Sequence, residues 1–255
     1  MELYTLLLTT FIAAALTDVA TCLGCVPFFF VRQISTKSAG MFTALAAGMM
    51  AAASLVQLVG EGLDKSQQFM AWDVGIGVAL GSLFFLAAAR WVEHNDELDL
   101  LALRKKSGAA SLLIVLAMTI HSLPEGIAIG VGYGSGQNEF GLAVALAIGI
   151  HNIPEGLAIA LALRPRGVST WACVGWALFS SIPQPLAAVP AAWAVWLFNP
   201  LLPGLMGFAA GAMLHLVVSE LLPVGTSQSG KTATATAFVA GVVVMIVLGE
   251  SVGIG

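Results

Sequence analysis

The sequence predicts an all-α membrane protein with eight transmembrane helices, on the basis of its composition and its hydropathy pattern. Of the 255 residues, 58 % are hydrophobic and 9 % are charged, whereas soluble domains average about 45–50 % apolar and about 25 % charged residues. Polar interruptions leave eight apolar segments, each long enough for the ~20 residues that a crossing requires. Because backbone polar groups in a bilayer must be satisfied internally, we expect these segments to be helices.

The eight segments fill most of the chain, so we expect a single membrane domain over residues 1–255. The first and sixth segments exceed the length of one crossing and are predicted to be tilted, bent or extended beyond the lipid. The expected helices lie near 3–31, 41–60, 72–90, 110–131, 140–163, 170–197, 201–223 and 232–252.

The composition also excludes several classes of function. The deficit of charge excludes a soluble enzyme and a disordered chain, and ten Lys and Arg residues against 14 Asp and Glu residues leave no basic surface for nucleic acid. Three cysteines are too few for a disulfide framework. Cys22 and Cys25 form a CxxC pair inside an apolar segment, which favours thiols in the core over a metal site. The opening MELY has no basic region, so we expect no cleaved signal peptide.

The distribution of basic residues predicts the orientation. Nine of the ten lie in the loops that follow the first, third, fifth and seventh segments, and only Lys65 lies in an even-numbered loop. Positive charge stays on the cytoplasmic side of a membrane. We therefore expect both termini to be extracytoplasmic in an inner or plasma membrane. The basic residues of the odd-numbered loops are Arg32, Lys37, Arg90, Arg104, Lys105, Lys106, Arg164, Arg166 and Lys231.

Two internal repeats indicate how the segments are related. HSLPEGIAI at 121–129 recurs as HNIPEGLAI at 151–159, in two neighbouring segments that run in opposite directions. A weaker repeat pairs AAGMM at 46–50 with AAGAM at 209–213. Together they predict three helices, a central pair and three more helices. The outer triplets would form an inverted repeat, which is a recurring transporter design.

The central pair carries ionisable groups in the middle of apolar segments. His121 and Glu125, like His151 and Glu155, are spaced i, i+4, so each pair lies on one helical face. Each such group costs roughly 3 kcal/mol or more at mid-membrane depth. Imidazole and carboxylate ligands suit divalent transition metals. Two copies of the motif therefore favour a metal or proton site over a hydrogen-bonded network between helices.

Proline and glycine in the two motifs predict local backbone features. Pro124 and Pro154 each remove one backbone N–H and displace the carbonyl four residues earlier, next to each histidine. A kink there would turn backbone oxygens toward a polar cavity. Gly126 and Gly156 allow a neighbouring helix to approach closely.

These motifs resemble those of the ZIP (Zrt-, Irt-like protein) family of divalent metal transporters. The similarity lies chiefly in HSLPEG at 121–126 and HNIPEG at 151–156, and it extends over essentially the whole chain. The supporting stretches are AAGMMAAAS at 46–54, IPQP at 182–185 and AAGAMLHLVVSELLP at 209–223.

The resemblance implies transport of a divalent cation into the cytoplasm through a site on the fourth and fifth helices. Its ligands would be His121, Glu125 and Glu155, with Met50 as a soft fourth ligand. Zinc is the first candidate, followed by iron, manganese, cobalt and cadmium, and the ion is cargo rather than a cofactor. The resemblance also implies that helices 1, 4, 5 and 6 move as a carrier against helices 2, 3, 7 and 8, a scaffold through which the chain forms a homodimer.

The sequence departs from the pattern of relatives that bind a second metal. Those relatives use Asn and Asp after the two histidines and Glu on the sixth helix, whereas this chain has Ser122, Asn152 and Gln184. None of the three is a carboxylate. Two dications against Glu125 and Glu155 alone would leave a charge of +2 in a low dielectric, which is costly. We therefore expect one tightly held metal.

Other polar residues have less specific interpretations. His151 is expected to line the exit path or to hydrogen-bond a ligand, and Asp18 to face either a metal entrance or a helix–helix hydrogen bond. His215 and Glu220, five residues apart, do not share one helical face, which favours packing or a proton relay. For the acidic loop at 93–99, a solvated turn is favoured over capture of the departing metal.

Two other functions compete with metal transport. An intramembrane metalloenzyme could use the HxxxE pairs, but the HExxH arrangement is absent from the sequence. A proton-coupled carrier of an organic solute would need aromatic and amide groups around the motifs, and the chain has only two tyrosines.

Overall fold

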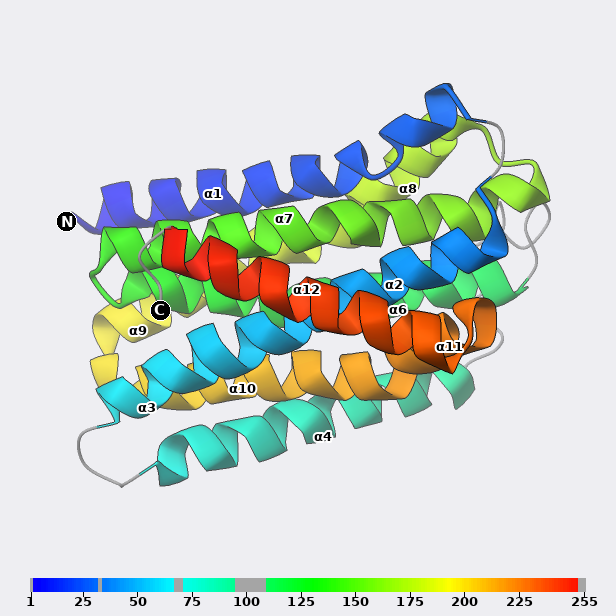
Figure 1. Cartoon of the computed structure of the whole chain (residues 1–255). Helices are drawn as coiled ribbons and strands as arrows, with labels where there is room; N and C mark the ends of the chain where they lie inside the picture. The colour runs from blue at the N-terminus through cyan, green and yellow to red at the C-terminus, as the bar shows by residue number, and fades with distance from the viewer. Residues whose placement is uncertain (1, 32–33, 67–70, 95–108, 252–255) are drawn as a thin grey trace.

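A computed structural model describes residues 2–31, 34–66, 71–94 and 109–251, and all regular structure in these ranges is helical. The predicted all-α class is therefore confirmed for the described chain. The helices run side by side along the long axis of an elongated bundle (Figure 1). They are α1 (Leu3–Leu23), α2 (Thr36–Ala52), α3 (Glu61–Lys65), α4 (Trp72–His94), α6 (Ala109–Gly134), α7 (Asn138–Leu163), α8 (Thr170–Ser181), α9 (Pro183–Leu197), α10 (Leu202–Leu216), α11 (Leu222–Ser229) and α12 (Lys231–Ser251).

Seven helical stretches of the described residues are long and apolar enough to cross a membrane. Each coincides with one of the predicted segments. The remaining predicted segment, the fourth, corresponds to α6, a helix of 26 residues that contains Pro124. The seven stretches are Leu3–Phe29, Thr36–Lys65, Trp72–Trp91, Asn138–Arg166, Thr170–Leu197, Asn199–Ser229 and Lys231–Ser251.

The two longest predicted segments, which were expected to be tilted, bent or extended beyond the lipid, each contain a break in the α-helix. In the first, α1 ends at Leu23 and a short 3₁₀ helix follows at Val26–Phe29. In the sixth, Ile182 separates α8 from α9, which begins at Pro183. Proline lacks the N–H that a continuing α-helix would use, so the chain can bend there without leaving a donor unsatisfied.

The second and seventh segments each contain a π-helical stretch. Ala53–Gly60 follows α2 and leads into α3, and Val217–Leu221 follows α10 and leads into α11. A π-helical stretch inserts extra backbone into a helix and often marks a functional position. Both stretches follow the weakly repeated AAGMM and AAGAM sequences.

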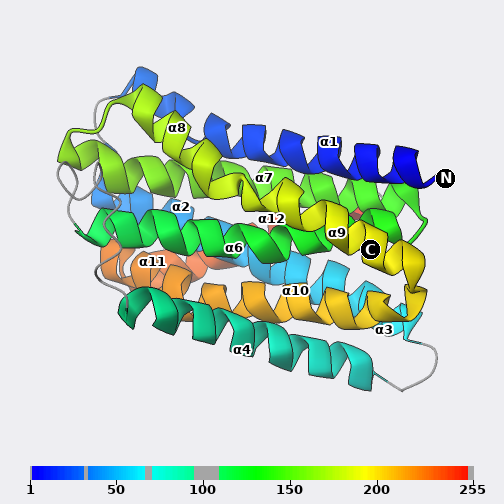
Figure 2. The same ribbon diagram turned by 180° about the vertical axis from the view of Figure 1, so that it is seen from behind.

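Four pairs of helices have the most extensive contacts with each other. They are α4 with α10, α6 with α9, α2 with α12, and α1 with α7. In both views α6 and α7 lie between α1 at one edge of the bundle and α4 at the other (Figures 1 and 2). The motif-bearing helices pack against each other and against several neighbours: α6 also contacts α9, α10 and α8, and α7 also contacts α1, α2 and α8.

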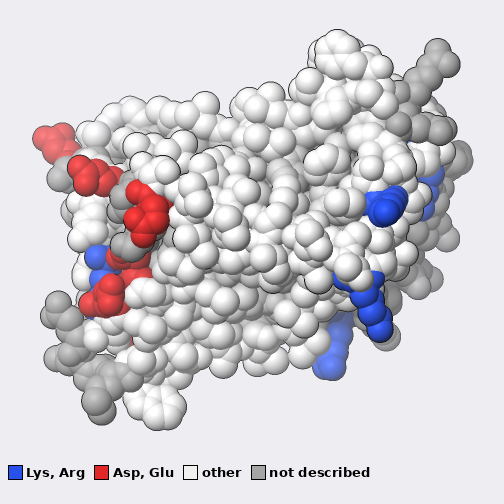
Figure 3. Space-filling view, in the orientation of Figure 1, with Lys and Arg blue, Asp and Glu red and all other residues white. Residues whose placement is uncertain are grey.

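On the face shown in Figure 3, charged side chains gather at the two ends of the bundle and the middle carries none. One end is mainly acidic, although Lys65 pairs with Glu61 and Gln137, and the Lys and Arg side chains in view gather mainly at the other end. The N-terminal end of α1 and the C-terminal end of α12 both lie at the acidic end (Figure 1). The acidic loop after α4 falls largely in residues 95–108 and so lies outside the described residues, as do Arg104, Lys105 and Lys106.

Candidate metal centre

The two repeated motifs bring four ionisable side chains into the buried centre of the bundle. His121 and Glu125 lie one turn apart on α6, and His151 and Glu155 lie one turn apart on α7. All four are between 0 and 7 % exposed. Ionisable groups at this depth require partners or a bound cation.

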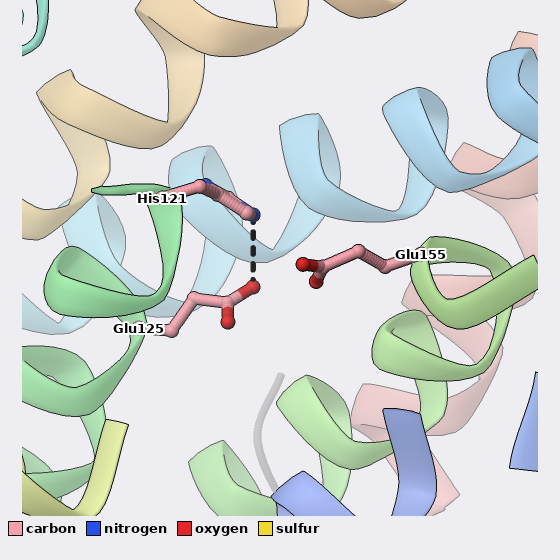
Figure 4. Close-up of side chains that lie close together, drawn as sticks. All are labelled: His121, Glu125 and Glu155. Atoms are coloured by element: carbon pink, nitrogen blue, oxygen red, sulfur yellow. Dashed lines mark ion pairs between the residues drawn. The ribbon is translucent and has the colours of Figure 1, made fainter. Parts of the chain in front are cut away.

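Three of these side chains converge on one point. One ligand atom each from His121, Glu125 and Glu155 lies within 4.8 Å of the other two. His121 Nε2 is 3.0 Å from Glu125 Oε1, and the Glu155 carboxylate points toward this pair from the opposite helix (Figure 4). A nitrogen and two carboxylates at this spacing are a donor set that suits a divalent transition metal.

The His121 imidazole has no hydrogen bond to either ring nitrogen among the described residues, although its Nε2 lies 3.0 Å from Glu125 Oε1. Glu155 Oε1 is likewise unpaired within the described structure. Buried polar atoms almost always have a partner, so a cation at the convergence point would satisfy both groups.

His151 does not join the three-residue group but contacts it. Its Nε2 donates a hydrogen bond of 2.7 Å to Glu125 Oε1, across the interface between α7 and α6. This contact fits the expected role of hydrogen-bonding a ligand, because it fixes the orientation of the Glu125 carboxylate. The two motifs are nearly identical in sequence, but His151 has a hydrogen bond to Glu125 and His121 has none.

Gln184 connects the group to α9 and α1. Its side-chain amide donates to Glu125 Oε2. Its carbonyl oxygen Oε1 accepts from Thr17 Oγ1 at 2.9 Å and from Asn152 Nδ2 at 3.3 Å. The break before α9 places Gln184 in the first turn of that helix, facing the centre. The resulting network of neutral groups holds both Glu125 and the neighbouring helices in place.

The remaining predicted residues lie at different places. Ser122 is fully buried and donates to the Ser180 carbonyl oxygen at 2.8 Å, which ties α6 to α8. Met50 is buried in the main apolar core on α2, and its role as a fourth ligand stays a prediction. His215 packs away from the centre, with its Nδ1 2.8 Å from Ser82 Oγ on α4.

Sequence reasoning missed Thr17 and Thr21 as partners of the centre. Thr17 bonds Gln184, and Thr21 Oγ1 accepts from Ser181 at 2.9 Å. A signal was present, because Thr10, Thr17, Asp18 and Thr21 share one buried face of an otherwise apolar helix. The spacing of these residues predicts a polar face on α1, but it does not predict which helices this face contacts.

Comparisons with known proteins show which family the chain resembles. A family model described as ZIP Zinc transporter matches residues 93–249. The zinc transporter GufA of Myxococcus xanthus is 35 % identical over 256 residues, which cover 95 % of this chain and 98 % of that protein.

Two further relatives are longer than this chain. A protein of Arabidopsis thaliana named as a candidate zinc transporter is 39 % identical over 219 residues, which cover 86 % of this chain and 35 % of that protein. The zinc transporter ZIP11 of Homo sapiens is 46 % identical over 150 residues, which cover 56 % of this chain and 43 % of that protein. The chain thus matches about a third of the length of the Arabidopsis relative.

Proposed function

The chain belongs to the ZIP zinc transporter family, and from this premise we propose that it carries a divalent transition-metal cation, zinc first, across the membrane into the cytoplasm. It is an integral membrane protein, and proteins of this family are transporters rather than enzymes. The observation that carries the proposal is the buried convergence of His121, Glu125 and Glu155 within 4.8 Å.

In this proposal, His121, Glu125 and Glu155 bind the ion, and Met50 adds a soft ligand. His151 acts on the ion through Glu125, whose carboxylate it orients. The two carboxylates carry a charge of −2, which one dication neutralises. Iron, manganese, cobalt and cadmium suit the same nitrogen and oxygen ligands. The ion is cargo, and we propose no resident cofactor.

We propose that this group holds one ion tightly. Ser122 and Asn152 are uncharged, and each is already hydrogen-bonded to a backbone carbonyl oxygen. Gln184 turns an amide N–H, not an oxygen, toward Glu125. A second ion next to the first would therefore meet no additional negative charge from these three side chains.

Replacing Gln184 with Glu should increase the occupancy of a second position next to the first. The substitution adds a negative charge and replaces the amide donor next to Glu125 with an acceptor, which a cation can satisfy. Zinc counted per purified chain after equilibrium dialysis should rise toward a second ion. The matched control is Gln137→Glu, at an exposed position in the turn before α7. Equal zinc contents in the two variants would contradict the assignment of Gln184.

We further propose a 3+2+3 arrangement with an inverted repeat, in one domain of eight crossings. The packing pairs support it: α4 with α10 corresponds to α12 with α2, and α6 with α9 corresponds to α7 with α1. The two π-helical stretches occur at matching places in the second and seventh helices. A pseudo-twofold relation would produce both correspondences.

An elevator-like motion is the transport mechanism that we propose. The carrier would contain α1, α6, α7, α8 and α9, and the scaffold α2, α3, α4, α10, α11 and α12. Each of the four most extensive helix pairs falls within one of these units, and none joins the two. Such a division allows one unit to slide with little loss of packing. The scaffold would also form the homodimer.

For the orientation, we propose that the acidic end faces away from the cytoplasm. Lys and Arg gather at the opposite end, in agreement with the tendency of positive charge to remain cytoplasmic (Figure 3). Both termini would then be extracytoplasmic. Cations arriving from outside would meet carboxylates such as Asp64 and Asp73 first.

Uptake into proteoliposomes tests the function directly. Purified protein should move zinc across the bilayer, and a panel of zinc, iron, manganese, cobalt and cadmium should rank the ions. Zinc should also stabilise the protein against heat, because an ion that binds only the folded state adds to its stability. Absence of uptake for every ion on the panel, by protein that retains its helical content, would contradict the proposal.

A further inference from the structure

Lys65 is the one basic residue that the sequence places in an even-numbered loop. It is the last residue of α3, which lies at the acidic end of the bundle (Figure 1). Positive charge tends to remain on the cytoplasmic side of a membrane, and in the proposed orientation this end faces away from the cytoplasm. The position of Lys65 therefore runs against the charge rule, and its contacts must explain why a lysine is tolerated there.

The Lys65 ammonium contacts three side chains. Its Nζ lies 3.6 Å from Glu61 Oε2, one turn earlier on α3. It donates a hydrogen bond of 3.2 Å to Gln137 Oε1, in the turn before α7. It also lies 5.9 Å from the centroid of the Phe140 ring, in the first turn of α7, within the ~6 Å over which an aromatic face attracts a cation. One ammonium thus joins α3 to the beginning of α7.

This contact crosses the boundary between the two units of the proposed elevator-like motion. Lys65 belongs to the scaffold through α3, whereas Gln137 and the helix that it precedes, α7, belong to the carrier. By contrast, the hydrogen bonds from Gln184 and His151 to Glu125 join carrier helices to one another. The Lys65–Gln137 bond is therefore placed where the carrier would move past the scaffold.

A cavity of about 800 Å³ lies on the same boundary. The scaffold contributes Asp64, Lys65 and Asp73 to its lining, and the carrier contributes Ser135 and Gln137. Lys65 and Gln137 thus line one cavity from opposite units and are bonded to each other. Because a hydrogen bond requires its heavy atoms within about 3.2 Å, sliding of the carrier along the scaffold would break this bond and change the shape of the cavity.

We propose that Lys65 is a positioning residue for transport, whose bond to Gln137 holds the carrier against the scaffold at the acidic end and must break each time the carrier slides. The proposal rests on the elevator-like motion proposed above. Glu61 lies on the same helix as Lys65, so it keeps the ammonium paired when Gln137 moves away.

The strength of the contact suits this role. The side chains of Lys65 and Glu61 are 24 and 30 % exposed, and Gln137 is exposed. Polar pairs that water reaches change an equilibrium by only about 1.4- to 5-fold. A contact of this strength delays the movement of the carrier without preventing it.

Zinc uptake into proteoliposomes, measured over a range of zinc concentrations, tests the proposal. Gln137→Leu removes the acceptor without changing any charge, and Lys65→Met removes the ammonium but keeps an unbranched side chain. Each should raise the maximal rate by about 1.4- to 5-fold, and the double variant should be no faster than the faster single variant. Gln137→Leu should leave KM unchanged. Maximal rates that stay the same or fall in both single variants would overturn the proposal, as would independent increases in the double variant.

Two further variants separate the contact from the charge. Lys65→Arg keeps a cation with several donors and should retain the wild-type rate. Lys231→Met removes an exposed lysine from the first turn of α12 and should also leave the rate unchanged. An increase in Lys231→Met equal to that in Lys65→Met would assign the effect to net charge and overturn the role of the contact.

A reversible cross-link tests the movement itself. In a chain that carries both Lys65→Cys and Gln137→Cys, a reducible bifunctional thiol reagent should stop zinc uptake, and reduction should restore it. Each single cysteine variant, treated in the same way, controls for reaction with the native cysteines. Uptake that persists after complete cross-linking would refute the proposed break between Lys65 and Gln137. If the untreated wild type moves no ion of the panel, the proposed function fails instead, so the two failures are distinguishable.

Discussion

Replacing Glu125 with Gln is expected to abolish zinc uptake and to lower zinc affinity by more than about 100-fold. Loss of a group that only positions a ligand typically costs ~10–100-fold, and Glu125 is proposed as a ligand itself. Its Oε1 lies 3.0 Å from His121 Nε2 and 2.7 Å from His151 Nε2, and its Oε2 accepts from Gln184. The amide has no negative charge and turns an N–H toward one of these donors.

Two measurements check this result. The first is zinc uptake into proteoliposomes at equal protein content. The second is thermal stabilisation by zinc, which for a wild-type protein at a zinc concentration of 100 times Kd is worth ~2.7 kcal/mol and should be absent in the variant. Glu139→Gln, which removes an exposed acid from the first turn of α7, is the matched control. Wild-type uptake by Glu125→Gln would refute the proposed site.

The sequence predicts the central cluster well because the relevant geometry is local. Spacing of i, i+4 on a helix places His121 above Glu125 and His151 above Glu155 without any tertiary information. Because the motif is repeated, two consecutive segments each have such a face. A short connection between the segments makes the two helices neighbours. The convergence within 4.8 Å follows from these two facts.

The different surroundings of the two histidines could not be predicted in the same way. The motifs are nearly identical, yet His151 bonds Glu125 on the other helix, whereas His121 approaches the glutamate of its own helix. The contacts depend on how α6 and α7 are placed relative to each other, which is set by packing along both helices. Sequence spacing carries no information about it.

The hydrogen bonds that α1 makes to the centre could not be predicted from the sequence either. Its polar face is visible in the spacing of Thr17, Asp18 and Thr21, but its partners lie far away in the chain, at Asn152, Ser181 and Gln184. A polar face indicates burial against something polar, not against which helix. The partners of Thr17 and Thr21 could therefore be identified only from the packing of α1 against α7, α8 and α9.

Gly156→Ala is expected to destabilise the protein by at least about 1–3 kcal/mol, the usual cost of overpacking a core. A Cβ atom at this position would overlap the backbone carbonyl oxygen of Thr21 and lie 2.8 Å from its carbonyl carbon. A backbone carbonyl cannot rotate away as a side chain can, so α1 itself would have to shift. That shift would disturb Thr17 and Thr21, and with them their hydrogen bonds to Gln184 and Ser181.

Gly175→Ala is the matched control, with an expected effect of the opposite sign. Apart from its chain neighbours and the backbone of its own helix, no described atom lies within 4 Å of a Cβ added at Gly175, which is in the middle of α8. Alanine is favoured over glycine inside a helix by roughly 0.5–1 kcal/mol, so this variant should keep or raise the thermal midpoint while Gly156→Ala lowers it. Zinc affinity distinguishes a packing effect at the centre from a general effect on helix stability. Only Gly156→Ala, which would move α1, should lower the zinc affinity. Equal midpoints and equal zinc affinities in the two variants would mean that the contact between α1 and α7 does not position the centre.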